Sequence, residues 1–152
     1  MGQISVIISR NPGSALSANQ HTGDILNSAR PKYDLKYYTD LAVQLEKAGA
    51  HIIAVKDMAG LLKPAAARVL FRALREATDL PIHFHTQVTS GIAAATVLAA
   101  VESGADVVDA AMDALSGNTS QPCLGSIVDL CRCQPDVRRY RQGDAVLQGG
   151  RR

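Results

Sequence analysis

Two segments of the chain share a pattern in which a short apolar run is followed by polar residues and then by a helical pattern. Residues 51–60 read HIIAVKDMAG, and residues 81–91 read PIHFHTQVTSG. Apolar runs of this length, separated by a helical pattern, predict buried parallel strands in an α/β fold. Such folds hold their chemistry at the carboxyl ends of the strands, so Lys56, Asp57 and His85 are candidate site residues.

Helical and strand patterns alternate from Lys32 to about Leu130. The spacing of apolar residues predicts helices near 34–48, 64–77 and 90–103, and strands near 51–55, 81–85 and 106–111. Repeated units with short links imply parallel strands and right-handed crossovers. We therefore expect a partial (β/α)8 barrel with three strands, or four with the apolar run ISVII, about half of a fold that typically needs ~250 residues.

The two ends of the chain lack this alternation. Residues 1–21 form a divergent segment, in which ISVII is followed by NPGSALSANQ, and Pro12 and Gly13 mark the latter as a loop. Residues 22–130 are interpreted as one domain. Residues 131–152 are rich in Arg and have almost no apolar periodicity, which predicts a disordered tail. A tail that binds an acidic partner is the alternative.

The composition excludes several classes of function. The 152 residues are 47% hydrophobic and 20% charged, with a net charge of +2, which is ordinary for one globular domain. We expect no nucleic-acid partner and no membrane partner, since no apolar run approaches the ~20 residues of a membrane span. The pair Cys131 and Cys133 is too little for a zinc site. With Cys123 the cysteine count is odd, which suits a cytoplasmic protein.

Five passages carry a resemblance to a known family: TGDILNSARPKYDLKYY, LEKAGAHIIAVKDMAGLLKP, PIHFHT, SGADVVDAAMDALSG and NTSQP. They resemble the carboxyltransferase domain of pyruvate carboxylase, from about Thr22 to Leu130. KDMAGLLKP and TSQP also occur in biotin-dependent relatives such as the α subunit of oxaloacetate decarboxylase, whereas TGDIL with KYDLKYY favours pyruvate carboxylase. The resemblance implies the middle and later strands of a TIM barrel.

The same resemblance implies a chemistry. In the family, carboxybiotin releases CO2 at a divalent metal, zinc or manganese, and pyruvate enolate captures it to give oxaloacetate. The lysine of KDMAG becomes carbamylated and ligates the metal, and its match here is Lys56. The family writes H-x-H-T-H-D on the later strand, where the second histidine, a metal ligand, matches His85. The third, also a ligand, is Gln87 here, and the aspartate is Val88.

These departures weaken the expected metal site. A glutamine oxygen is a weaker donor than an imidazole for zinc or manganese. His83 shares the strand face of His85 and Gln87 but lies deeper, so it cannot easily replace position 87. A matching first-strand aspartate ligand, the catalytic threonine beyond TSQP and a biotin-bearing segment are not found in the chain. Lys56 and His85 are then the two clear ligands, fewer than the three or four of a tight site.

Each candidate also has a purely structural interpretation. Lys56 and Asp57 could form an ion pair at the end of a strand, and His83 a hydrogen-bonded core residue. Asp109 and Asp113, near the end of the third strand, could be acid/base groups, but local hydrogen bonding and helix capping are favoured for both. The remaining histidines, His21 and His51, are interpreted as loop or strand-start residues without a role.

Two classes of function stay open. The chain is either a carboxyltransferase region that is active only when other segments complete it, or a non-catalytic barrel fragment that acts as a scaffold. In both cases an open half-barrel would expose strand edges and an apolar inner face, so we expect self-association. The resemblance places the activity in the cytoplasm, or in the mitochondrial matrix of a eukaryote, in gluconeogenesis and anaplerosis.

Overall fold

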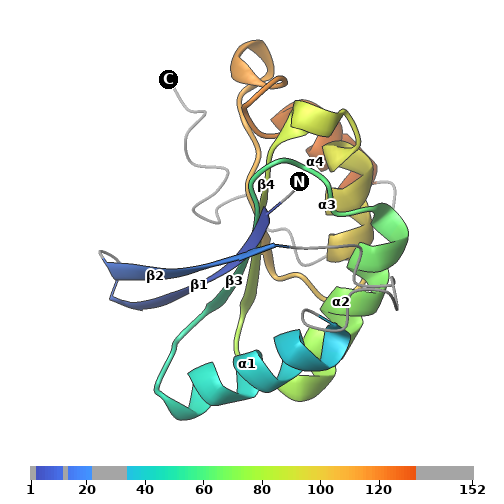
Figure 1. Cartoon of the computed structure of the whole chain (residues 1–152). Helices are drawn as coiled ribbons and strands as arrows, with labels where there is room; N and C mark the ends of the chain where they lie inside the picture. The colour runs from blue at the N-terminus through green and yellow to red at the C-terminus, as the bar shows by residue number, and fades with distance from the viewer. Residues whose placement is uncertain (1–2, 12–13, 22–33, 133–152) are drawn as a thin grey trace.

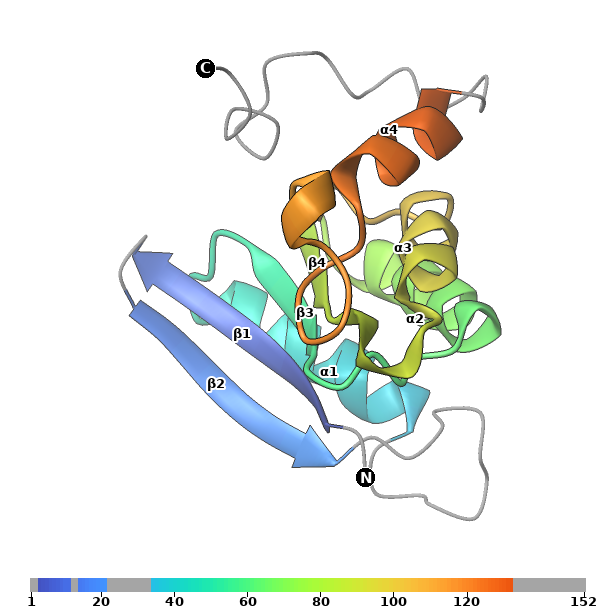
Figure 2. The same cartoon turned by 90° about the horizontal axis from the view of Figure 1, so that it is seen from above.

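The computed structural model describes residues 3–11, 14–21 and 34–132 of the chain. They form a five-stranded sheet in the order β2-β1-β3-β4-β5, with the helices on one side of it (Figures 1 and 2). Strands β3 (Ile53–Asp57), β4 (Ile82–Thr86) and β5 (Val107–Val108) run parallel, in a register that pairs Lys56 with His85. The expected partial α/β barrel is therefore confirmed for this part of the chain.

The helices follow the predicted order along the chain. They are α1 (Leu35–Lys47), α2 (Pro64–Ala77), α3 (Ala93–Val101) and α4 (Leu124–Arg132). Helix α1 begins where the Asp34 carboxylate accepts a hydrogen bond from the Tyr37 backbone N–H at 2.8 Å. Helix α2 begins with Pro64, which its first turn tolerates because that N–H needs no partner. A short 3-10 turn, η2 (Val88–Ser90), precedes α3, which is shorter than predicted.

Side-chain alternation on β4 divides the sheet into two faces. Ile82, Phe84 and Thr86 are fully buried, whereas His83 and His85 between them are partly exposed. Phe84 packs against Phe71 of α2, with ring centroids 5.1 Å apart in an edge-to-face arrangement. The apolar core therefore lies between the sheet and the helices, and the histidines lie on the opposite, open face.

Arg75 fixes the positions of β4 and β5 at their amino ends. Its guanidinium donates to Asp106 Oδ2 at 2.8 Å and to the carbonyl oxygens of Thr78 and Leu80 at 2.8 and 2.7 Å. Asp106 Oδ2 also accepts the Ile82 backbone N–H at 2.9 Å. One side chain thus joins the end of α2, the start of β4 and the start of β5, and so sets where the following residues of β5 lie.

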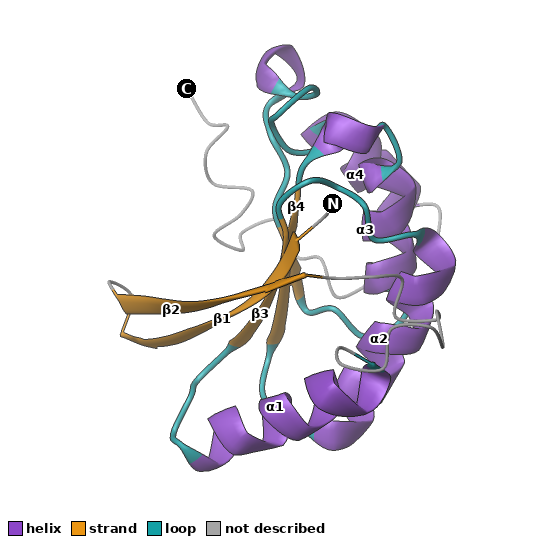
Figure 3. Cartoon of the chain, viewed as in Figure 1, coloured by secondary structure: helices purple, strands orange, loops and turns teal. Residues whose placement is uncertain are grey.

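The N-terminal segment differs from the prediction. Ser14–His21 is a strand, β2, which pairs antiparallel with β1 (Gln3–Asn11), so its interpretation as a loop was wrong. β1 in turn pairs antiparallel with β3, so ISVII is not a fourth parallel barrel strand. The two strands form a hairpin that extends away from the helices (Figure 3). Ser14–His21 is mostly polar, so its backbone pairing with β1, and not an apolar pattern, makes it a strand.

Helix α4 reaches Arg132, two residues into the segment expected to be a disordered tail, and Cys131 on it is buried. Residues 133–152, including Cys133, lie outside the described residues. β5 is shorter than predicted, although the Asp109 N–H just beyond it still donates to the Phe84 carbonyl oxygen at 3.2 Å. Ala111 forms an isolated parallel bridge with Cys123. None of the described helices combines the length and apolar character needed to cross a membrane.

Candidate functional site

Lys56 and His85 lie side by side on the open face of the sheet. They are register partners on β3 and β4, and both side chains are partly exposed. Neighbouring strands of a sheet lie about 4.8 Å apart, so register partners whose side chains project from one face are close neighbours. The structure therefore brings together the two residues that the sequence singles out as ligands.

Asp57 points to the other face and has a structural role. Its side chain is 1% exposed. Its carboxylate accepts the backbone N–H groups of Leu61 and Leu62, each at 3.0 Å, and the Thr86 hydroxyl at 3.2 Å. Adjacent strand residues face opposite sides, so the expected ion pair between Lys56 and Asp57 does not form. Asp57 instead shapes the loop after β3 and attaches it to the end of β4.

Asp109 joins the two histidines of β4. His83 Nε2 lies 2.9 Å from Asp109 Oδ1, and His85 Nδ1 lies 2.6 Å from Oδ2. Burial by itself raises the pKa of Asp109, but the hydrogen bonds and charges of His83 and His85 outweigh this and hold its pKa well below the usual range. An ionised carboxylate only accepts hydrogen bonds. His83 therefore donates through Nε2 and His85 through Nδ1, which leaves Nε2 of a neutral His85 with its lone pair.

The prediction of local bonds and helix capping was wrong for Asp109, whose partners lie on another strand. The H-x-H pattern indicated that His83 and His85 share one face of β4, but their contact with Asp109 depends on the register between β4 and β5. For Asp113 the predicted helix capping is found, at the first turn of α4, but its side-chain partners are distant in sequence and not local. It accepts the Gly125 backbone N–H and the Cys123 thiol, each at 3.0 Å, at the first turn of α4. Both hydrogen bonds lower the pKa of Asp113, and the bond from the Cys123 thiol has the larger effect.

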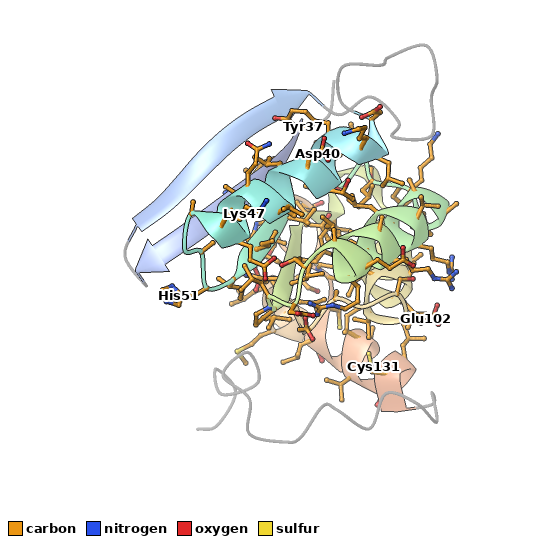
Figure 4. The ribbon with its side chains drawn as sticks, turned by 90° about the horizontal axis from the view of Figure 1, so that it is seen from below. Tyr37, Asp40, Lys47, His51, Glu102 and Cys131 are labelled. Carbon is orange, nitrogen blue, oxygen red and sulfur yellow. The ribbon has the colours of Figure 1, made fainter. Side chains whose placement is uncertain are left out.

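His51 and Cys131 lie apart from this site, whereas His83 belongs to it through Asp109. His51 is exposed and precedes β3, at the end of the sheet away from the loops that follow the strands (Figure 4). His83 is hydrogen-bonded, as expected, but lies on the open face and not in the core. Burial raises the pKa of the Cys131 thiol on α4, and the nearby Glu102 carboxylate raises it further. Burial and a raised pKa both favour a packing role for Cys131. The side chain of His21 lies outside the described residues.

The donor set fits a metal ion only in part. A metal-binding histidine commonly donates its other ring N–H to a carboxylate, as His85 does to Asp109. Lys56 lies beside it, and the extended backbone of Gln87 continues the strand beyond it. Among the described residues, however, no group of three or more His, Cys, Asp or Glu side chains could hold a metal ion. The described part of the chain thus places two possible donors, Lys56 and His85, side by side.

Comparisons with known proteins agree with these motifs. The HMGL-like family model matches residues 20–134. Pyruvate carboxylase 1 of Caenorhabditis elegans is 56% identical over 117 residues, which are 76% of this chain and 10% of that protein. Pyruvate carboxylase of Bacillus subtilis is 55% identical over 102 residues, 67% of this chain and 9% of that protein. The chain thus spans about a tenth of the curated relatives it matches.

A solved structure is closer still in sequence. The carboxyl transferase domain of Rhizobium etli pyruvate carboxylase, with pyruvate and biocytin, is 89% identical to the matched part. The match has a TM-score of 0.70 and covers 72% of this chain and 18% of that chain. The matched part therefore has the same fold as the corresponding part of the solved domain.

We expect Asp109→Asn to disturb the ring of His85. An amide offers one acceptor oxygen where the carboxylate offers two, so at most one imidazole keeps its bond. Long-range ¹H–¹⁵N spectra of the metal-free chain should show the Nδ1–H form of His85 in the wild type and a mixture of tautomers in Asp109→Asn. Asp79→Asn, at an exposed aspartate, is the matched control and should leave both rings unchanged. Unchanged spectra in Asp109→Asn would contradict the assignment.

Proposed function

The chain belongs to the HMGL-like family, and on that premise we propose that it carries part of a carboxyltransferase site of the pyruvate carboxylase type. The observation that carries this proposal is the register pairing of Lys56, within an intact KDMAG motif, with His85, whose ring is held by Asp109. The solved relative contains pyruvate and biocytin, which supports pyruvate and carboxybiotin as the substrates that a completed site would take. Biotin would come from a segment outside the 152 residues described by this sequence.

Each residue has a separate task in this proposal. The Lys56 amine adds to CO2 and loses a proton, so that its carbamate offers an anionic oxygen to the metal. His85 offers Nε2, because Asp109 accepts the hydrogen bond from Nδ1. Zinc or manganese, when bound, would polarise the carbonyl oxygen of pyruvate and stabilise the enolate. Gln87 stands at the third ligand position and contributes at most a weak neutral oxygen.

We place this activity in the cytoplasm, or in the mitochondrial matrix if the source is a eukaryote, with a role in gluconeogenesis and anaplerosis. Related proteins support both locations, because the mouse relative is a mitochondrial pyruvate carboxylase and another relative is bacterial. The relatives named here carry the activity on chains about ten times as long as the matched part.

We expect the chain to bind zinc weakly and Gln87→His to strengthen binding. Residues 85 and 87 project from the same face, so two imidazoles there reach one ion. The substitution raises the strong ligands from two to three, the number that a catalytic zinc site usually takes from protein. Recovery should be partial because Val88 replaces a polar neighbour, and changes around metal ligands typically cost roughly 10–100-fold in affinity.

Isothermal titration with zinc in bicarbonate buffer measures this directly. The wild type, Gln87→His and Gln87→His with His85→Ala are compared, and the last should lose the gain. Mass spectrometry under native conditions should find a carbamate on Lys56 and none in Lys56→Ala. Equal zinc affinity in all three proteins would show that positions 85 and 87 do not form the site.

A second candidate is a non-catalytic barrel fragment, which Gln87 and Val88 favour because they replace a family ligand and its neighbour. We expect this 152-residue chain alone to form no oxaloacetate from pyruvate, even with carboxybiotin and metal supplied. Two strong donors are too few to hold the ion that the reaction needs. A coupled assay for oxaloacetate tests this, with Lys56→Ala as the background. Metal-dependent turnover above that background would contradict the expectation.

The same candidate predicts self-association. β5 pairs only with β4 in the described part of the chain, so its other edge is open, and the helices lie on one side of the sheet (Figure 1). Unpaired strand edges join other chains, so we expect a dimer or larger species in solution. Light scattering at several concentrations should show a mass above that of one chain. A compact monomer at every concentration would contradict it.

A further inference from the structure

The loops that follow β3, β4 and β5 interlock at the carboxyl ends of the strands. Gly60, in the loop after β3, accepts a hydrogen bond from the Ser90 hydroxyl after β4. The Val88 backbone N–H donates to the Ser120 carbonyl oxygen at 2.9 Å, in the loop after β5. Residues 87–90 are therefore held between the KDMAG loop on one side and the TSQP segment on the other.

Gly60 touches the backbone of Gln87 in a way that no other residue could. A Cβ atom placed on Gly60 would overlap the Gln87 carbonyl oxygen and lie 3.1 Å from its carbonyl carbon. Gly60 also has φ +62°, in the left-handed region that L side chains rarely adopt. The absence of a side chain at Gly60 thus sets how closely, and where, the backbone of Gln87 lies.

The position of Gly60 is itself fixed by hydrogen bonds within the loop after β3. The Gly60 N–H donates to the Asp57 carbonyl oxygen at 3.4 Å, and the carboxylate of Asp57 accepts the N–H groups of the next two residues, Leu61 and Leu62. The Leu62 carbonyl oxygen in turn accepts the Thr96 hydroxyl of α3 at 2.7 Å. These hydrogen bonds fix the backbone of Gly60, and the residues that follow β4 pack against it.

We propose that Gly60 is a positioning residue for residue 87. Because Gly60 has no side chain, the Gln87 carbonyl group can contact its backbone directly. This contact orients the backbone so that the side chain at position 87 projects from the face that carries His85 and Lys56. The KDMAG motif then has two tasks. It supplies Lys56, and through Gly60 it positions residue 87, the third ligand position, at the end of the neighbouring strand. The second task concerns backbone geometry and holds whichever side chain stands at position 87.

Gly91 offers a matched control for this proposal. It lies in the same loop as Gln87 and has φ +81°, but a Cβ atom there would meet nothing within 4 Å. Gly60→Ala and Gly91→Ala therefore carry a similar backbone strain, and only the first adds the overlap with Gln87. Ser90→Ala removes one bond to Gly60 without adding bulk, and serves if Gly60→Ala fails to fold.

Amide hydrogen exchange of the full metal-free chain gives the first readout. The reporter is the exchange rate of the Val88 N–H. It is divided by the exchange rate of a reference amide away from this loop, the Thr78 N–H, which donates to the Leu74 carbonyl oxygen at the end of α2. We expect a ratio about tenfold higher in Gly60→Ala, a few-fold higher in Ser90→Ala, and unchanged in Gly91→Ala. An unchanged ratio in Gly60→Ala, or an equal rise in both glycine variants, would overturn the proposal.

Zinc titration in the Gln87→His background gives the second readout, and this part rests on the proposed function. Gly60→Ala should lose most of the zinc affinity that Gln87→His gains, whereas Gly91→Ala should keep it. If Gln87→His gains no affinity, the metal role fails and the exchange ratio still decides the role of Gly60. If affinity is gained and Gly60→Ala keeps all of it, the positioning role is overturned.

Discussion

The buried carboxylate of Asp57 is the contact on which the site end of the sheet depends. It lies at the last residue of β3, and its three hydrogen bonds attach the following loop to the end of β4. A buried carboxylate must be fully paired, because each buried polar group left without a partner costs about 1–3 kcal/mol. The loop after β3 therefore has little freedom. Its conformation places Gly60 against the backbone of Gln87, just after β4. The backbone position of Gln87 therefore depends on the carboxylate of Asp57.

Strand alternation then decides which groups the open face carries. On β4, Ile82, Phe84 and Thr86 fill the space under the helices, so His83 and His85 must face away from the core. Asp109, beyond β5, meets both imidazoles because Arg75 and Asp106 fix the start of that strand beside β4. The orientation of His85 is thus a consequence of core packing and of one ion pair at the opposite end of the sheet.

The sequence predicted the regular part well where apolar periodicity carried the signal. Helix α2 has the predicted bounds, since Pro64 marks its start and an apolar stripe its inner face. β2 was missed because polar residues give no periodic signal when a backbone ladder is what stabilises the strand. The contact of Asp109 with the histidines was also missed, since it depends on the register between strands, which local patterns do not specify. The family resemblance supplied Lys56 and His85 as candidate ligands, and the register of β3 and β4 places these two residues next to each other.

The backbone frame of the site is independent of the side chains that depart from the family. Residues 87 and 88 differ from the family pattern, but the contacts that hold them are made by main-chain atoms: the Gln87 carbonyl on Gly60, and the Val88 N–H on the Ser120 carbonyl. A substitution at either position changes the donor that is presented and leaves these contacts in place. The fold can therefore keep the backbone geometry at positions 87 and 88 after the side chain there has changed. The retained KDMAG and TSQP motifs are therefore evidence that the backbone geometry is preserved. What can bind there depends separately on the side chain at position 87.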